Sequence, residues 1–179
     1  LGDGDVLVLA GSIPYTMPDD MYQRILERIQ GRGVLTVVDA TRDLLVKVLP
    51  YHPFLVKPNN YELGEIFGVK LSTREEVVPY GKKLQEMGAQ NVLISMAGEG
   101  AVLIAADGQS MGAPAPKGTL VNGVGAGDSM VAGFLTGWME KKDYVHAFHM
   151  GIAAGSASAF SENLATREEV LQVLQQVEQ

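Results

Sequence analysis

The sequence is poor in several residue types, and each shortage narrows what the protein can be. Its 179 residues include no cysteine and a single tryptophan. Without cysteine, disulfide bonds and metal sites built on thiolates are excluded. The sequence also has no apolar run of membrane-spanning length and no signal-peptide pattern at its start. We therefore expect a cytoplasmic protein that has no membrane partner.

Positive charge is scarce too. Lysine and arginine number 14 against 21 aspartate and glutamate residues, which gives a net charge of −7. This balance argues against nucleic acid as the main partner, because the phosphate backbone attracts basic proteins. A phosphorylated small molecule stays compatible, since its site needs only a few local cations. Hydrophobic residues, by contrast, make up 46% of the chain, enough for one domain with a sizeable core over residues 1–179.

Segments typical of strands and helices alternate along the chain. We expect strands over residues 6–10, 34–39, 54–57 and 91–95, the first of them buried. A hairpin is expected over residues 101–113. We expect helices over residues 19–32, 41–49, 60–67, 72–87, 129–139, 144–160 and from 166 onward. Capping boxes are predicted from Ser72 to Glu75 and from Thr166 to Glu169. The alternation predicts an α/β fold with a mostly parallel, doubly wound sheet flanked by helices, whose ligands bind at the carboxyl ends of the strands.

The segment Gly125-Ala126-Gly127-Asp128 carries the most chemical information. Its small residues let backbone N–H groups turn toward one point, and the helix predicted to follow adds its positive end. The result is a hole for an anion with the Asp128 carboxylate beside it, which suits the transfer of a phosphoryl group to a hydroxyl. For this segment alone, a Gly-rich loop before a core helix is an equally good interpretation.

Together with Ser129, this segment resembles the C-terminal signature of the ribokinase-like (PfkB) carbohydrate kinases. The resemblance implies that Asp128 is the catalytic base. It also implies that residues 125–127 form the anion hole and contact the nucleotide. The sequence departs from the signature at Gly123, where the family usually has Ser, Thr, Pro or Val.

Asn59 and Glu62 stand three residues apart at a predicted helix start, so their side chains can share one face. A carboxylate and an amide oxygen are suitable ligands for hydrated Mg²⁺. The pair resembles the Asn-x-x-Glu motif of the same kinases. This implies that Glu62 and Asn59 bind Mg²⁺ and that Asn59 also contacts the nucleotide phosphates. Ordinary N-capping by Asn59 is the alternative for the pair by itself.

The segment from Ser95 to Gly100 resembles the Ser-x-Gly-x-x-Gly nucleotide loop of the family. Ser95 and Gly100 match this pattern, while Ala97 replaces its first glycine and Gly98 supplies a glycine one position later. The resemblance implies that Ser95, Gly98 and Gly100 contact the phosphates of ATP. Without the resemblance, a two-residue hairpin turn explains the segment equally well.

Gly11 and Ser12 follow a predicted strand in a segment similar to the Gly-Ser-Leu-Pro of the family branch that phosphorylates sugar phosphates. This similarity implies that Gly11, Ser12 and Asp128 contact the substrate. We expect Lys57 to supply a cation for the substrate phosphate and Asp39 to orient loops near the site. A strand-exit turn and an ordinary surface lysine are the alternatives.

The C-terminal segment 155–170 is similar to that of the 1-phosphofructokinase and tagatose-6-phosphate kinase branch. The resemblance also implies that the helix predicted over 144–160 forms a wall of the adenine pocket. His146 and His149 lie three residues apart on this helix. No third ligand is near them in the sequence, so we do not expect them to bind a metal.

The resemblance covers the whole chain and implies ATP-dependent phosphorylation of fructose 1-phosphate to fructose 1,6-bisphosphate, with tagatose 6-phosphate as the alternative substrate. The chain begins at Leu1 in what looks like the interior of a larger fold. Full-length relatives carry an N-terminal part and a lid that makes a homodimer, and neither is present in this sequence. We therefore expect the C-terminal, nucleotide-binding part of such a kinase, with little or no turnover by itself. A catalytically inactive nucleotide-binding fragment is the competing class, and a scaffold that binds no nucleotide is the third.

Overall fold

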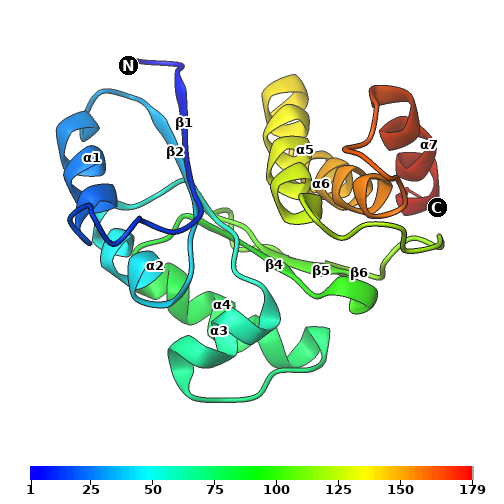
Figure 1. The fold of residues 1–179 in the computed structure, drawn as a ribbon, viewed down its shortest axis with the longest axis horizontal. Coiled ribbons are helices and arrows are strands. Elements are labelled where there is room, and N and C mark those ends of the chain that lie inside the picture. The colour runs from blue at the N-terminus through cyan, green and yellow to red at the C-terminus, as the bar shows by residue number, and fades with distance from the viewer. Residues whose placement is uncertain (179) are drawn as a thin grey trace. The chain divides into compact units, whose positions relative to one another are not determined.

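The computed structural model describes residues 1–178, which separate into two compact units (Figure 1). The first unit comprises Leu1–Met96 and Val102–Met111. The second comprises Ala97–Ala101 and the chain from Gly112 onward. That the chain forms one domain stays a prediction.

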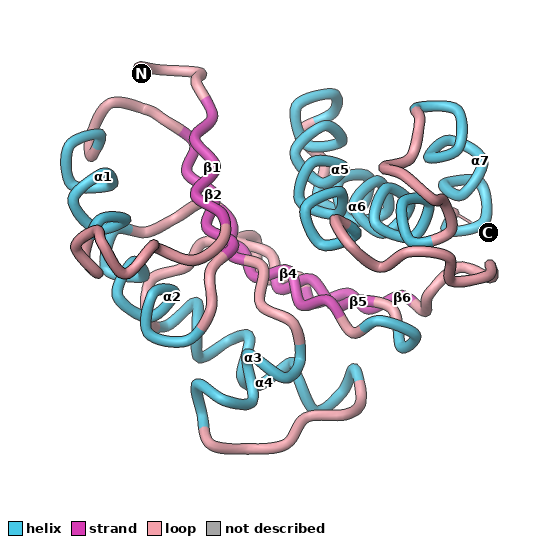
Figure 2. The backbone as a smooth tube through the Cα atoms, viewed as in Figure 1, coloured by secondary structure: helices cyan, strands magenta, loops and turns pink. Residues whose placement is uncertain are grey.

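The strands form one mixed sheet, drawn in magenta in Figure 2. Its strands, in spatial order, are β1 (Val6–Ala10), β2 (Leu35–Asp39), β3 (Leu55–Val56), β4 (Asn91–Ser95), β5 (Ala101–Ile104) and β6 (Ser110–Ala113). The neighbours from β1 to β4 pair in parallel. The connections from β4 to β5 and from β5 to β6 are only five residues long, too short for a parallel crossover. The sheet therefore has a parallel part and a hairpin, which confirms the predicted α/β fold.

Helices connect the parallel strands and cover one face of the sheet in the first unit (Figure 1). They are α1 (Met21–Ile29), α2 (Arg42–Val48) with the 3₁₀ turn η1 (Leu49–Tyr51), α3 (Asn60–Phe67) and α4 (Arg74–Glu86). Right-handed crossovers between strands that follow one another in order place every connecting helix on the same face. Leu45, Leu63 and Leu84 of these helices share a buried cluster with Val38 and Ile94 of the sheet. This core holds the strand ends, and the residues that follow them, in fixed positions.

The first strand is less buried than the sequence predicts. β1 lies at one edge of the sheet and has a neighbour only in β2 within the described residues. Leu9 is its one buried residue, and Val8 is 43% exposed. The strand predicted over residues 6–10 is therefore confirmed, but the prediction that it is buried is wrong, because an edge strand has one side without a partner.

The two helices for which the sequence predicted capping boxes both begin with one, and one of these boxes starts one residue later than predicted. In α4 the pair is Thr73 with Glu76, so the prediction of Ser72 with Glu75 is wrong. The Glu76 carboxylate accepts hydrogen bonds from the backbone N–H of both Ser72 and Thr73, at 2.7 and 3.1 Å. Because Glu76 can accept from both N–H groups, the capping box of α4 begins at Thr73 rather than at Ser72. The capping box predicted for the last helix, α7 (Arg167–Val177), is confirmed.

In the second unit, α5 (Ala126–Lys141) packs closely on α6 (Tyr144–Ala159). A Cβ atom placed on Gly133 of α5 would overlap the backbone carbonyl of Met150 on α6. In return, a Cβ on Gly155 of α6 would lie 3.0 Å from the Ala126 carbonyl oxygen. Small residues on both helices thus allow the backbones to approach, and they fix how the start of α5 sits on α6.

Candidate active site

The candidate residues of the first unit follow the carboxyl ends of adjacent parallel strands. The Gly11 N–H, just after β1, donates a hydrogen bond of 3.0 Å to the Asp39 carbonyl at the end of β2. Asn59, beyond the end of β3, forms an isolated parallel bridge with Ser95, the last residue of β4. The structure therefore brings these predicted residues into one row along the edge where α/β sheets bind ligands.

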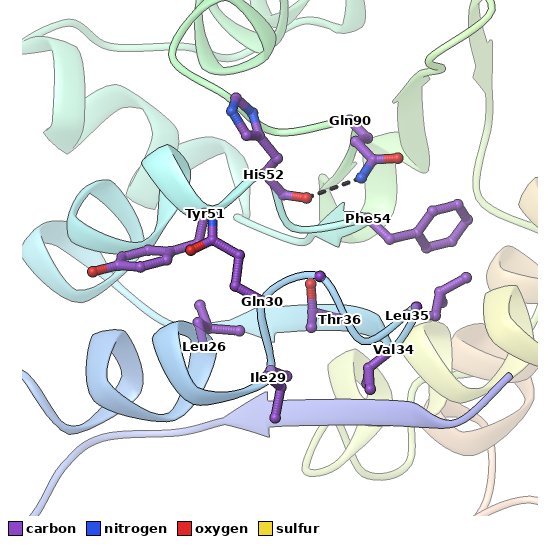
Figure 3. Close-up of a pocket in the computed structure, with 12 residues that line it drawn as sticks. Leu26, Ile29, Gln30, Val34, Leu35, Thr36, Tyr51, His52, Phe54 and Gln90 are labelled. Atoms are coloured by element: carbon purple, nitrogen blue, oxygen red, sulfur yellow. Dashed lines mark hydrogen bonds between the residues drawn. The ribbon is translucent and has the colours of Figure 1, made fainter. Parts of the chain in front are cut away.

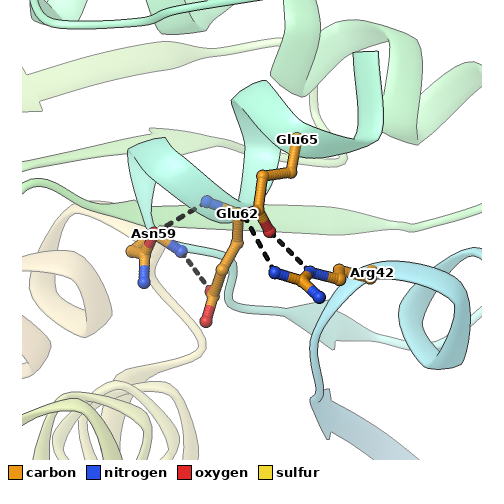
Figure 4. A network of polar contacts seen from close by, with 4 residues as sticks. All are labelled: Arg42, Asn59, Glu62 and Glu65. Atoms are coloured by element: carbon orange, nitrogen blue, oxygen red, sulfur yellow. Dashed lines mark hydrogen bonds and ion pairs between the residues drawn. The ribbon is translucent and has the colours of Figure 1, made fainter. Parts of the chain in front are cut away.

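Asn59 and Glu62 form a reciprocal capping box at the start of α3 (Figure 4). The Glu62 N–H donates to Asn59 Oδ1 at 2.8 Å, and the Asn59 N–H donates to Glu62 Oε2 at 2.8 Å. The capping interpretation of Asn59 is therefore confirmed. Capping leaves Glu62 Oε1 without a hydrogen bond among residues 1–178, so the same side chain can still bind a cation.

The chemistry of this pair fits Mg²⁺. The described residues contain no group of three or more His, Cys, Asp or Glu side chains that could hold a metal by themselves. Mg²⁺ does not need such a group, because it usually keeps several waters and is bound by one or two protein oxygens together with substrate phosphates. The next carboxylate of α3, Glu65, is paired with the Arg42 guanidinium at 2.8 and 3.1 Å. That pairing holds the pKa of Glu65 below its ordinary value, and it leaves Glu62 as the carboxylate available for a cation.

Lys57 is not a surface lysine. Its side chain is almost fully buried, and Nζ lies 3.2 Å from Asp39 Oδ2. Nearby, the Tyr22 hydroxyl donates hydrogen bonds to the Ala10 and Gly11 carbonyls, at 2.8 and 3.1 Å. Burial, together with the Asp39 charge, raises the pKa of Tyr22 above its ordinary value of 10. Lys57 is therefore part of a local polar cluster, and its contact with a substrate phosphate stays a prediction.

In the second unit, α5 begins at Ala126, three residues earlier than predicted. Gly125 precedes it with a φ of +80°, and its carbonyl accepts the first helical hydrogen bond, 2.8 Å from the Ser129 nitrogen. A side chain other than glycine rarely adopts this φ, so glycine at 125 allows the early start. As a result, Asp128 lies within the first helical turn rather than ahead of it, and its side chain is exposed.

This first turn has the backbone geometry of an anion site. Within residues 1–178, the N–H groups of Gly127 and Asp128 have no hydrogen-bond acceptor, as is usual for the first turn of a helix. Unpaired N–H groups and the positive end of the helix dipole attract a negatively charged group. Gly127 and Asp128 therefore offer an oxyanion-binding backbone and a carboxylate within two consecutive residues.

Several contacts that sequence reasoning missed hold the loop ahead of this turn. The N–H groups of Val121 and Asn122 donate to the Ala159 carbonyl at 2.8 and 3.1 Å. Asn122 Nδ2 also donates to the Glu162 carbonyl at 3.1 Å. Ser158 Oγ, from the end of α6, donates to Ser129 Oγ at 2.8 Å. These partners lie far apart in the sequence, so no local spacing could have indicated them.

The predicted nucleotide loop contains a 3₁₀ turn, η2 (Ala97–Glu99). Ala97 has a φ of +47°, a left-handed conformation that favours glycine, which explains why the family pattern has glycine there. Gly98 is exposed and has open space around it. Gly100 is buried, and a Cβ on it would overlap the Ala113 carbonyl. The need for glycine at position 100 is therefore steric, and its contact with a nucleotide stays a prediction.

The first unit also contains a cavity of about 280 Å³ (Figure 3). Leu35 and Thr36 line it from the start of β2, Phe54 from just before β3, and Gln90 from just before β4. These are the amino ends of the parallel strands, whereas Asp39, Asn59 and Ser95 lie at or beyond the carboxyl ends. The cavity therefore does not belong to the row of candidate residues in the first unit.

The histidine pair on α6 makes protein contacts. His146 Nε2 lies 3.1 Å from Glu140 Oε2, and the His149 ring packs against Phe148. None of the helices described for residues 1–178 is both long and apolar enough to span a membrane.

Comparison with known proteins gives one consistent answer. The pattern of the pfkB family carbohydrate kinases matches residues 1–170. The chain is 49% identical over 177 residues to the 1-phosphofructokinase of Bacillus subtilis, covering 99% of this chain and 58% of that protein. It is 35% identical over 176 residues to the D-tagatose-1-phosphate kinase of Bacillus licheniformis, covering 98% of this chain and 58% of that protein.

A solved structure shares the fold of this chain. The crystal structure of phosphofructokinase-2 from Escherichia coli, in complex with substrates and products, superimposes with a TM-score of 0.92 at 24% identity. The match covers 100% of this chain and 59% of that one. The chain thus spans less than two thirds of the length of the relatives it matches.

Proposed function

Because the chain belongs to the pfkB family of carbohydrate kinases, we propose that it is the nucleotide-binding part of an enzyme that phosphorylates a sugar phosphate. The proposed reaction converts ATP and fructose 1-phosphate into ADP and fructose 1,6-bisphosphate. One observation carries the proposal: the exposed Asp128 carboxylate stands in the first turn of α5, beside backbone N–H groups that have no acceptor in the described chain.

In this mechanism Asp128 accepts the proton of the acceptor hydroxyl. The hydroxyl oxygen forms a bond to the γ-phosphorus of ATP while the bond from that phosphorus to the bridging oxygen breaks, and ADP leaves. The N–H groups of Gly125, Ala126 and Gly127 stabilise the negative charge that develops on the transferred group. Of these, Ala126 N–H makes one long hydrogen bond, 3.3 Å to Gly123, which a ligand oxygen can replace.

The first unit supplies the metal and part of the nucleotide contacts. Asn59 and Glu62 would hold Mg²⁺, which would neutralise phosphate charge. Ser95, next to Asn59 in the parallel bridge, contacts the nucleotide phosphates together with Gly98 and Gly100. The support for these roles is the family pattern and, for Glu62, a carboxylate oxygen that capping leaves free.

Gly11, Ser12 and Lys57 are proposed to contact the sugar phosphate. A second candidate substrate is tagatose 1-phosphate, because a relative at 35% identity is named D-tagatose-1-phosphate kinase. That name favours a phosphate on C1 over the tagatose 6-phosphate that the sequence suggested. Fructose 1-phosphate is preferred because the relative with that activity in its name is 49% identical.

The chain covers 58% of that relative, so we propose that turnover also needs residues outside the chain. Those residues are proposed to complete the sugar pocket, to exclude water and to form the homodimer. The chain by itself is proposed to bind MgATP weakly and to turn over poorly. A wild-type rate for the isolated chain would contradict this.

The experiment that tests the proposal measures ADP release by the full-length protein with MgATP and fructose 1-phosphate. Asp128→Asn should lower kcat at least a hundredfold, because a general base contributes about 10² to 10⁴ in rate. Asp143→Asn is the matched control: Asp143 caps the next helix by accepting from the His146 N–H, and asparagine caps as well. Retention of more than a tenth of kcat by Asp128→Asn would overturn the proposal.

A further inference from the structure

Ser158 stands out in the second unit because it is polar and buried. It lies in the last turn of α6 and is only 3% exposed. Among residues 1–178, the buried polar side chains are those of Lys57, Asn60, Asn91 and Ser158, and only Ser158 belongs to the second unit. A buried hydroxyl costs free energy unless it is hydrogen-bonded, so its partners indicate why it is there.

The Ser158 hydroxyl links three segments. Its Oγ donates to Ser129 Oγ at 2.8 Å, in the first turns of α5. The same oxygen accepts from the Ala165 N–H at 3.1 Å, in the residue before Thr166, the N-cap of α7. One side chain therefore ties the start of α5 and the entry to α7 to the end of α6.

The hydrogen bond from Ser158 to α5 reaches the residue next to Asp128, the proposed catalytic base. Ser129 follows Asp128 directly, and its N–H makes the hydrogen bond to the Gly125 carbonyl that closes the first turn. That turn contains the amides of Gly127 and Asp128, which have no acceptor in the described chain. The hydrogen bond from Ser158 to Ser129 therefore fixes both the direction of these amides and the position of the Asp128 carboxylate.

We infer that Ser158 is a positioning residue for the phosphoryl-transfer site and acts through Ser129. It touches neither substrate nor nucleotide in this role. The inference rests on the proposed function for its effect on rate, but its effect on the first turn of α5 is independent of any activity. Sub-ångström changes in such a site alter the rate, because oxyanion donors act only when they are already oriented.

The test compares Ser158→Ala with Ser161→Ala in the full-length protein. Ser161 is the matched control because its hydroxyl, just beyond the end of α6, donates to the Ala157 carbonyl and to Glu169 and makes no hydrogen bond to α5 within the described residues. Ser158→Ala should lower kcat about fivefold, the equivalent of one net hydrogen bond, with KM for MgATP unchanged within twofold. Ser161→Ala should leave kcat unchanged.

A double-mutant cycle sharpens the test. Ser129→Ala removes the same hydrogen bond from the other side but leaves the Ala165 N–H its acceptor. If Ser158 acts through Ser129, the double variant should lose less kcat than the product of the two single losses. Strictly multiplicative losses, or an unchanged kcat in Ser158→Ala, would overturn the inference.

A second readout separates this inference from the proposed function. In amide hydrogen exchange, the peptide covering residues 121–131 should exchange about fivefold faster in Ser158→Ala than in Ser161→Ala. If the wild-type protein transfers no phosphoryl group to any sugar phosphate, the proposed function fails, and the exchange result still decides the positioning role. Equal exchange in the two variants would contradict that role whatever the activity.

Discussion

Asn59 and Glu62 bind each other's backbone: each side chain accepts a 2.8 Å hydrogen bond from the N–H of the other residue. The arrangement fixes the Glu62 carboxylate at the start of α3, beyond the end of β3. One carboxylate oxygen caps the helix and the other has no hydrogen-bond partner within residues 1–178. A structural role and a metal-binding role can therefore coexist in one side chain.

This dual role predicts the behaviour of Glu62→Gln. Glutamine keeps an oxygen that can accept from the Asn59 N–H but loses the charge that attracts Mg²⁺. The Mg²⁺ concentration needed for half-maximal activity should rise about tenfold or more, while the urea midpoint of unfolding changes little. Titrating the rate of the full-length protein with Mg²⁺ at fixed ATP measures this.

The matched control for Glu62→Gln is Glu76→Gln. Glu76 makes the same kind of capping box at the start of α4. This variant should leave the Mg²⁺ dependence as in the wild type. If the rates of the two variants depend equally on the Mg²⁺ concentration, Glu62 does not bind the metal.

A second prediction concerns the ion pair of Lys57 with Asp39. Lys57→Met leaves a largely buried carboxylate without its partner, and it should destabilise the protein by about 2 kcal/mol. This is less than for a fully buried pair, because Asp39 is 18% exposed. Urea unfolding measures the change. Lys47→Met breaks the exposed pair with Asp19 and should have little effect; equal losses for both variants would contradict the burial argument.

Gly133→Ala should destabilise the packing of α5 on α6. The new Cβ would overlap the Met150 carbonyl, and overpacking of this kind costs about 1 to 3 kcal/mol. Gly123→Ala is the control, because a Cβ there has open space and φ is not positive. A urea midpoint for Gly133→Ala that equals the wild-type value would show that the helices can move apart without cost.

Acidification should weaken the capping boxes at the starts of α4 and α7. Hydrogen bonds from the Ser72 and Thr73 N–H groups lower the pKa of Glu76, and the Thr166 N–H and hydroxyl lower that of Glu169, both from an ordinary value of 4.5. A lowered pKa stabilises the folded state above pH 4.5, and this contribution is lost as the pH falls through the folded-state pKa. The urea midpoint of the double variant Glu76→Gln and Glu169→Gln should therefore fall less between pH 6 and pH 3 than that of the wild type. An identical fall in both proteins would contradict the assignment.

The features that could be predicted from the sequence are local ones. The Thr166–Glu169 capping box, the Asn59–Glu62 pair and the glycines before Asp128 all depend on residues a few positions apart. Alternating apolar segments likewise predicted the parallel sheet, because each strand and helix carries its own period.

What the sequence could not predict depends on distant partners or on competition between neighbours. Ser158 and Ser129 are 29 positions apart, so their hydrogen bond has no local signature. Lys57 is buried because of the elements that pack around it, whereas lysine as a residue type is usually exposed. The capping box of α4 begins one residue later than predicted because Glu76 accepts from two N–H groups. The spacing of Ser72 and Glu75 in the sequence does not indicate this.

The central proposal is that this chain belongs to an enzyme that phosphorylates a ketohexose 1-phosphate. The most direct measurement follows the product: full-length protein is mixed with MgATP and fructose 1-phosphate, and fructose 1,6-bisphosphate is quantified against ADP. The account predicts one bisphosphate per ADP in the wild type, a smaller rate with tagatose 1-phosphate, and at least a hundredfold slower bisphosphate formation with Asp128→Asn. ADP release that is independent of the sugar phosphate, or bisphosphate formation by Asp128→Asn at more than a tenth of the wild-type rate, would contradict it.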